Sequence, residues 1–213
     1  MLNNASTLPE LLNTQGYTSK MTGKWHLGNA QWRQTPVGKG FDEHIGCYMW
    51  GLGSYSKRMY SSPQKPLVLD WVHAFKNGTF RHFAEARHST EAITSDAQAM
   101  LTAHSESLNN PFFLYVAFTA AHSPLQPMEK HMSKCMHIPH TWRRLYCGMV
   151  IGLDEAVKNI TETALKTIGS DTIIYVTSDN GGSTWFGGTN LPFRGGKTTS
   201  LEGNYMPSIK YFV

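Results

Sequence analysis

Polar side chains follow three short segments whose composition suits β-strands. The residues, and the segments that they follow, are Lys24 and His26 after residues 17–23, His122 after residues 112–118, and Asp179 and Asn180 after residues 172–176. In an open α/β sheet, ligands bind beyond the carboxyl ends of parallel strands. If the three segments share one such sheet, these side chains gather at one edge, and we expect a polar site there.

The residue types at this edge favour a metal ion and an oxyanion. The oxygens of Asp179 and Asn180 are ligands that suit Ca²⁺ or Mg²⁺. Lysine and histidine stabilise anions with several negative oxygens, as in a sulfate or phosphate ester. A nearby glycine-bearing segment, LPFRGGKTTSLEG, adds Lys197. Zinc is disfavoured because the chain has no clustered Cys and His ligands and no HExxH motif.

Each of these residues also has a purely structural interpretation. A single lysine in a loop is usually a solvated charge, and a histidine before Ser-Pro is commonly a turn residue. The segment Asp-Asn-Gly-Gly makes a good turn because Asn and Gly tolerate positive φ angles. The convergence of three polar strand ends on one edge favours a functional site over three separate turns.

The elements that would position these residues alternate between helix and strand. Helical spacing marks residues 8–15, 89–105 and 142–168, and each is followed by a strand-like segment, which is short after the first and fully apolar after the other two. Ser89 or Thr90 can cap the second helix, and Gly169 suits the position just after the third. Residues 29–87 show no periodicity and resemble a surface excursion that could line a pocket. The order predicts an α/β domain with a largely parallel sheet flanked by helices.

Composition excludes several classes of protein. The chain has 213 residues, of which 40% are hydrophobic and 16% charged, as in a soluble globular protein. No apolar run approaches the roughly 18 residues that cross a membrane. The net charge of +4 comes from scattered Lys and Arg residues, so we expect no nucleic-acid partner. The amino-terminal residues lack the pattern of a signal peptide.

Cysteines and glycosylation triplets give some information on the compartment. Cys47, Cys135 and Cys147 have no metal-ligand spacing, and their pairing stays open. Asn4, Asn77 and Asn159 each begin an N-glycosylation acceptor triplet, which supports a secretory route.

The chain resembles the sulfatase family, specifically its arylsulfatase B-like branch. The segments that carry the resemblance are LPELLNTQGYTSKMTGKWHLG, GFDEHIG, PFFLYVAFTAAHSPLQP, GMVIGLDEAVKNIT, VTSDNGG and LPFRGGK. They run in the family's order from about Leu8 to Lys197. The resemblance implies an alkaline phosphatase/sulfatase-like fold and the hydrolysis of sulfate esters, either aryl sulfates or sulfated glycosaminoglycans, in a lysosomal or secreted protein.

The resemblance also implies a role for each candidate residue. Sulfatases use a formylglycine nucleophile and a Ca²⁺ ion. Lys24 and His26 match residues that bind the sulfate and the formylglycine, and His122 matches a residue that contacts the sulfate and is a candidate acid. The remaining matches are Lys197, which would bridge sulfate and leaving group, and Asp179 and Asn180, which would bind Ca²⁺.

The chain departs from the family pattern at both ends. It contains no C/S-x-P-x-R motif, from which the formylglycine is made, and the family places this motif and two further calcium-binding aspartates before GKWHLG. We therefore expect residues 1–213 to be part of a catalytic domain, truncated at both ends and without the small C-terminal domain. Its calcium site would be incomplete, its sheet would lack a strand and be prone to aggregate, and it would be inactive alone.

Two alternatives remain open. The first is a non-catalytic protein that binds sulfated glycans and keeps Lys24, His26, His122 and Lys197 as an anion site. The second is a phosphate-ester hydrolase of the wider alkaline phosphatase-like superfamily.

Overall fold

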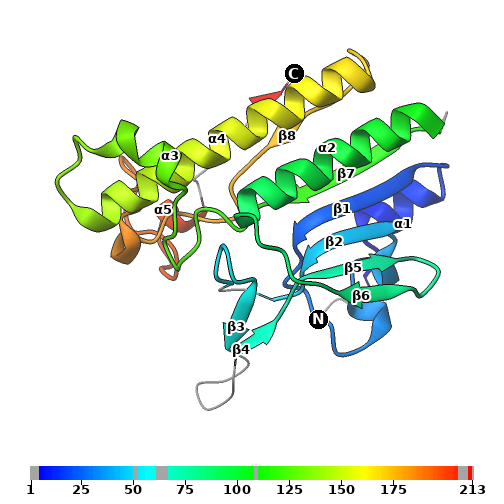
Figure 1. The fold of residues 1–213 in the computed structure, drawn as a ribbon, viewed down its shortest axis with the longest axis horizontal. Coiled ribbons are helices and arrows are strands. Elements are labelled where there is room, and N and C mark those ends of the chain that lie inside the picture. Colours follow the sequence, from blue (N-terminus) through cyan, green and yellow to red (C-terminus); the bar gives the residue numbers. More distant parts are fainter. Residues whose placement is uncertain (1–4, 50–51, 61–66, 108–109, 206–210, 213) are drawn as a thin grey trace. The chain divides into compact units, whose positions relative to one another are not determined.

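The computed structural model describes residues 5–49, 52–60, 67–107, 110–205 and 211–212, drawn as a ribbon in Figure 1. The chain divides into two compact units, Met1–Pro124 and Leu125–Val213. Asn4, the first of the three glycosylation triplets, lies outside the described residues.

A five-stranded sheet forms the centre of the first unit. Its order is β6-β5-β2-β1-β7, and its strands are β1 (Thr18–Lys24), β2 (Glu43–Cys47), β5 (Val72–Phe75), β6 (Phe80–His82) and β7 (Phe112–Ala117). β1 pairs in parallel with both β2 and β7, whereas β5 and β6 add antiparallel strands at one side. The α/β class with a largely parallel sheet is confirmed, and the sheet is mixed.

The remaining elements of the first unit surround this sheet. They are α1 (Leu8–Asn13), the 3₁₀ turns η1 (Trp32–Gln34) and η2 (Val37–Lys39), α2 (Ser89–Ser107) and the antiparallel pair β3 (Arg58–Tyr60) and β4 (Leu67–Leu69). Glu10 and Thr7 form a capping box at the start of α1. Its leucines do not make a buried face, because Pro9 is buried while Leu8 and Leu11 are exposed.

Helix α2 covers one face of the sheet through the apolar stripe that the sequence predicts (Figure 1). Five residues at helical spacing are buried: Ala92, Ile93, Ala97, Met100 and Leu101. The cap differs from the prediction, since Nδ1 of His88 accepts a hydrogen bond from Thr90 N at 3.2 Å. Ser89 already lies inside the helix.

The prediction of an unstructured excursion over residues 29–87 is wrong. Strand β2 lies in this range beside β1, and its polar residues explain why periodicity does not reveal it. His44 is fully buried and its Nε2 lies 3.2 Å from Gly23 O, while Glu43 forms ion pairs with Lys20 and His73. Because polar residues occupy both faces and find partners in the fold, β2 lacks the alternation of a half-buried strand.

Two glycines allow the three central strands to lie close together. Gly23 has φ +100°, and a Cβ there would lie 2.0 Å from Ala117 O on β7. Gly46 has φ +153°, and a Cβ there would lie 2.1 Å from Gly23 O. A side chain at either position would separate the strands, so glycine is required where the strands approach the polar edge.

The second unit is built on the long helix α4 (Thr141–Thr167). Its other elements are α3 (Glu129–Met132), η3 (Ser133–Cys135), β8 (Tyr175–Val176), η4 (Thr184–Phe186), α5 (Glu202–Tyr205) and β9 (Tyr211–Phe212). A disulfide joins Cys135 to Cys147 with an S–S distance of 2.06 Å, while Cys47 is a buried free thiol. Gly169 has φ +103° directly after the helix cap, which confirms its predicted role.

The third predicted strand does not join the main sheet in the described residues. Only Tyr175 and Val176 are in strand conformation, and they pair antiparallel with β9. Ile173 is 86% exposed and Tyr175 is 52% exposed. The apolar run predicts a strand covered on both faces, but within its own unit β8 has only this short partner. Among the described residues, no helix is long and apolar enough to cross a membrane.

The burial of His44 predicts a loss of stability in acid. Burial lowers the pKa of His44 to about 4, from 6.5. Between these values the imidazole of His44 is protonated in the unfolded chain and neutral in the folded chain. The stability that comes from burying the neutral ring is therefore fully present above pH 6.5 and is lost as the pH falls toward 4. We expect the free energy of unfolding to fall by up to about 3 kcal/mol over this range, measured by urea denaturation.

The variant His44→Gln should reduce this pH dependence, and His82→Gln serves as the control because His82 is exposed. An unchanged slope in His44→Gln would contradict the assignment.

Candidate functional site

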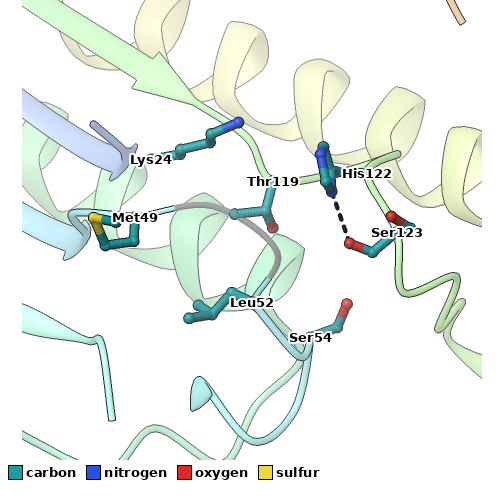
Figure 2. A pocket seen from close by; sticks show the side chains of 7 residues that line it. All are labelled: Lys24, Met49, Leu52, Ser54, Thr119, His122 and Ser123. Atoms are coloured by element: carbon teal, nitrogen blue, oxygen red, sulfur yellow. Dashed lines mark hydrogen bonds between the residues drawn. The ribbon is translucent and has the colours of Figure 1, made fainter. Parts of the chain in front are cut away.

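A pocket lies at the carboxyl ends of the parallel strands β1 and β7 (Figure 2). Lys24 is the last residue of β1, and His122 lies in the loop that follows β7. The pocket is lined by Lys24, Met49, Leu52, Ser54, Thr119, His122 and Ser123. The sequence-based prediction that the first two strand ends bring Lys24 and His122 together is confirmed.

The backbone of the loop fixes the tautomer of His122. Its Nδ1 lies 2.7 Å from Ser123 O, the contact drawn as a dashed line in Figure 2. A carbonyl oxygen only accepts hydrogen bonds, so Nδ1 carries the proton and Nε2 is the nitrogen that gains or loses one. A second bond, from His122 N to Thr119 O at 2.9 Å, holds the loop itself.

His26 lies beyond the pocket lining, on a rigid turn. It is exposed and has φ +55°, and His26 N donates to Tyr48 O at 2.9 Å. The neighbouring Trp25 is buried, and its Nε1 donates to Gly28 O and Gln34 O. The tryptophan therefore anchors the turn that carries Lys24 and His26.

A buried carboxylate holds one wall of the pocket. Oδ1 of Asp70 accepts from Tyr48 N at 3.0 Å, and Oδ2 accepts from Met49 N at 2.7 Å. Burial raises the pKa of Asp70, although these two bonds oppose the rise. Asp70 therefore fixes the backbone that leads into Met49, which lines the pocket.

A buried ammonium group holds the next part of the wall. Lys57 is fully buried, and its Nζ donates to Ser54 O at 2.8 Å, to Glu85 O at 3.3 Å and to Arg87 O. The ring of Trp71 lies 5.2 Å away. Burial lowers the pKa of Lys57 to about 8. At neutral pH the ammonium keeps three N–H donors, which match its three carbonyl acceptors.

The start of α2 connects this wall to the histidine loop. Ser89 N donates to Ser54 O at 2.8 Å, and Ser89 Oγ lies 2.9 Å from Thr119 Oγ1. Ser54 and Thr119 both line the pocket and belong to different segments of the chain. Ser89 therefore connects the segment of Ser54 to the loop that carries His122.

The remaining candidate residues lie in the second unit. Asp179 is exposed, and Asn180 is half-buried with its Nδ2 donating to Gly181 O at 3.0 Å. Lys197 is half-buried, and Lys197 N lies 3.4 Å from Gly182 O. The structure thus brings the loop of Lys197 to the turn that follows Asp179 and Asn180.

Asn190 fastens these two loops. Its Oδ1 accepts from Gly182 N at 2.8 Å, and its Nδ2 donates to Gly182 O at 2.9 Å and to Gly195 O at 3.0 Å. The amide of Asn190 thus both donates to and accepts from the backbone of Gly182, as a residue in a neighbouring β-strand would. Asn190 therefore positions the segment that leads to Lys197.

The described residues do not by themselves fit a calcium ion. Asp179 and Asn180 are adjacent and offer two or three hard oxygens, whereas Ca²⁺ takes about six to eight. Within the described ranges, no group of three or more His, Cys, Asp or Glu side chains could hold a metal.

Sequence reasoning found two residues that line the pocket, Lys24 and His122, and missed residues that hold the surrounding backbone. The missed residues are Lys57, Asp70, Ser89 and Asn190. Asp70 and Lys57 bond to backbone groups that are distant in sequence, so no local motif marks them. Asn190 bonds to Gly182 and Gly195 in its own part of the chain. Lys57, for example, is fully buried, but the residues around it in the sequence do not indicate this burial.

The sequence matches known proteins along nearly all of its length. A sequence model of the Sulfatase family matches residues 2–208. Arylsulfatase J of Mus musculus is 37% identical over 204 residues, covering 95% of this chain and 33% of the relative. N-acetylgalactosamine-6-sulfatase of Homo sapiens is 30% identical over 204 residues, covering 92% of this chain and 37% of the relative. The chain thus spans well under half the length of these relatives.

Solved structures include two that share the fold of this chain. The crystal structure of Ps i-CgsB in complex with k-i-k-neocarrahexaose has a TM-score of 0.80 and 29% identity, covering 92% of this chain and 44% of that chain. The PsFucS1 sulfatase from Pseudoalteromonas sp. has a TM-score of 0.72 at 23% identity, covering 97% of this chain and 44% of that chain, and supports the fold alone.

The contacts of Lys57 predict a large cost for its removal. In Lys57→Met the backbone carbonyls of Ser54, Glu85 and Arg87 lose their donor, at about 1 kcal/mol each, so the free energy of unfolding should fall by about 3 kcal/mol. The control Lys76→Met removes an exposed ion pair with Asp42 and should cost less than about 1 kcal/mol. Urea denaturation measures both, and equal costs would contradict the role assigned to Lys57.

Proposed function

The chain belongs to the sulfatase family, and on that premise we propose that it provides the sulfate-binding part of a sulfate-ester hydrolase. The observation that carries the proposal is the meeting of Lys24 and His122 in one pocket at the ends of parallel strands. A sulfate monoester has one negative charge spread over three terminal oxygens. The Lys24 ammonium and polar groups of the pocket wall match that distribution.

In this proposal Lys24 and His122 have different tasks. Lys24 neutralises the charge of the sulfate, because an ammonium in a partly buried site makes strong charge-assisted bonds. His122 has its Nδ1 proton held by Ser123 O, so Nε2 can carry a second proton to the leaving oxygen of the ester. The fixed ring orientation supports this acid role.

The other predicted residues are proposed to contact the sulfate, the nucleophile or a calcium ion. His26 lies on the same anchored turn as Lys24 and is proposed to contact the sulfate or the nucleophile. Lys197 is proposed to contact the sulfate and the leaving group. Asp179 and Asn180 are proposed as two ligands of a calcium ion whose remaining ligands come from residues beyond this sequence.

The nucleophile is proposed to be a formylglycine that this sequence does not contain. No Cys or Ser in the 213 residues stands in a C/S-x-P-x-R motif. Cys47 does not substitute for it, because the thiol is buried and burial raises its pKa to about 12, so it is not a thiolate at neutral pH. We therefore propose that residues 1–213 alone bind sulfate esters without hydrolysing them.

The proposed substrates are sulfated glycans or small aryl sulfates. Support comes from the names of relatives, which include an arylsulfatase and an N-acetylgalactosamine-6-sulfatase, and from a similar structure solved with k-i-k-neocarrahexaose. The chain is proposed to be one part of a sulfatase catalytic domain.

A secretory or lysosomal location completes the proposal. The Cys135–Cys147 disulfide supports it, because such bonds persist in oxidising compartments and are rare in the cytosol. Cys135 is fully buried, which is typical of a structural disulfide.

A second candidate function is non-catalytic binding of sulfated glycans. The absence of the C/S-x-P-x-R motif favours it, because an anion pocket without a nucleophile still binds its ligand. The two candidate functions use the same pocket, but only the hydrolase would convert the sulfate ester to product.

Binding of 4-nitrocatechol sulfate to the chain tests the pocket. We expect Lys24→Met and His122→Gln each to weaken binding about tenfold, since a charged hydrogen bond contributes about 1.5 kcal/mol or more. Lys76→Met removes the same charge at the opposite edge of the sheet and should change binding less than about twofold. Calorimetry measures the affinities. Equal losses in Lys24→Met and Lys76→Met would show that only net charge matters.

Hydrolysis of 4-nitrocatechol sulfate tests the missing nucleophile. The purified 213-residue chain should release no 4-nitrocatechol, with or without added Ca²⁺. Release that disappears in His122→Gln would contradict the proposed inactivity. A natural longer form that contains C/S-x-P-x-R and hydrolyses the ester would support a sulfatase, whereas an inactive longer form would support the binding protein.

A further inference from the structure

The turn between β5 and β6 contains one of the three glycosylation triplets, Asn77-Gly78-Thr79. All three residues are exposed. Gly78 has φ +92°, and a Cβ at this position would meet no atom within 4 Å. The turn therefore projects into open surroundings within the first unit, where an attached group has room.

The conformation of Asn77 presents its amide nitrogen. Oδ1 of Asn77 accepts a hydrogen bond from Thr79 N at 2.9 Å, which is an Asx turn. Because Oδ1 and Nδ2 lie on opposite sides of the amide carbon, this bond turns Nδ2 away from the backbone. The turn is itself held by Gly78 N donating to Phe75 O at 3.0 Å and by Phe75 N donating to Thr79 O at 2.8 Å.

The triplet at Asn159 has the opposite surroundings. It lies inside α4, and Asn159 and Thr161 are half-buried. In an α-helix the N–H of residue 161 bonds to the carbonyl of residue 157, so it cannot bond to the side chain of Asn159. Asn159 O also accepts from Thr163 Oγ1 at 2.8 Å. The helix thus excludes the local geometry that Asn77 has.

We propose that Asn77 is an N-glycosylation site. The proposal rests on the secretory route proposed above and is independent of sulfatase activity. The co-reactant is a lipid pyrophosphate-linked oligosaccharide. Asn77 Nδ2 forms a bond to C1 of its first sugar and loses one proton, while the C–O bond to the pyrophosphate breaks and the lipid pyrophosphate leaves.

The site is compatible with an open anion pocket. Strand β5 runs antiparallel to β2, with Val72 opposite Gly46 and Phe75 opposite Glu43. Residues 76–79 therefore lie at the amino-terminal end of β2, whereas Lys24 pairs with Cys47 at its carboxyl end. Figure 1 shows the β5–β6 turn at the end of the sheet away from the β1 and β2 arrowheads. A glycan on Asn77 leaves the Lys24 pocket uncovered.

The test is a peptide map of the chain after expression in cultured insect cells with an added signal peptide. Removal of N-glycans by a glycosidase in ¹⁸O-water converts each glycosylated Asn to a labelled Asp. We expect the label at position 77. In the same digest, a disulfide-linked peptide pair containing Cys135 and Cys147 shows that the chain reached an oxidising lumen.

Matched variants define the acceptor. Asn77→Gln and Thr79→Ala should abolish the label at position 77, Thr79→Ser should keep it because the hydroxyl remains, and Asn159→Gln should leave it unchanged. An unlabelled Asn77 in chains whose Cys135 and Cys147 are linked would overturn the proposal, as would a label at 159 without one at 77. An unlabelled Asn77 in chains with unlinked cysteines would overturn it together with the secretory route.

Binding of 4-nitrocatechol sulfate separates this proposal from the function. The glycosylated chain and Asn77→Gln should differ less than twofold in affinity, because the glycan lies at the other end of the sheet. A larger difference would contradict this placement. Failure of both forms to bind would count against the sulfate-binding function and would leave the label at Asn77 as separate evidence.

Discussion

The parallel pairing of β1 with β2 and β7 is the constraint on which the first unit depends. Parallel strands end at the same edge of a sheet, so Lys24 and the loop of His122 must lie close together. The close approach requires Gly23, where a Cβ would lie 2.0 Å from a carbonyl of β7. The glycine that begins the GKWHLG segment is therefore part of the site, although it has no side chain.

Around this edge, buried polar groups fix loops that hydrophobic packing alone would leave loose. Asp70 holds the backbone of Tyr48 and Met49, and Lys57 binds three carbonyls from two segments. Buried charges are costly unless they are fully hydrogen-bonded, and both of these are bonded to backbone groups. The pocket is therefore held by charged groups that do not line it themselves.

The sequence predicted the elements with strong periodicity and the residues next to them. The buried stripe of α2 and the meeting of Lys24 with His122 follow from local patterns and from the rules of parallel sheets. Strand β2 was missed because His44 and Glu43 break its alternation and find partners only in the fold. The apolar run of the third strand predicts a place in the sheet, but among the described residues β8 pairs only with β9. The roles of Asp179, Asn180 and Lys197 stay predictions.

The central claim is that Lys24 and His122 form an anion site before any catalytic group is added. The most direct measurement is an NMR titration of the histidine ring signals of the chain with inorganic sulfate at constant ionic strength. The account predicts saturable shifts of the His122 ring signals, with those of the buried His44 unchanged, and loss of the His122 shifts in Lys24→Met. Unchanged His122 signals in a folded chain, or equal shifts for exposed histidines throughout the chain, would contradict it.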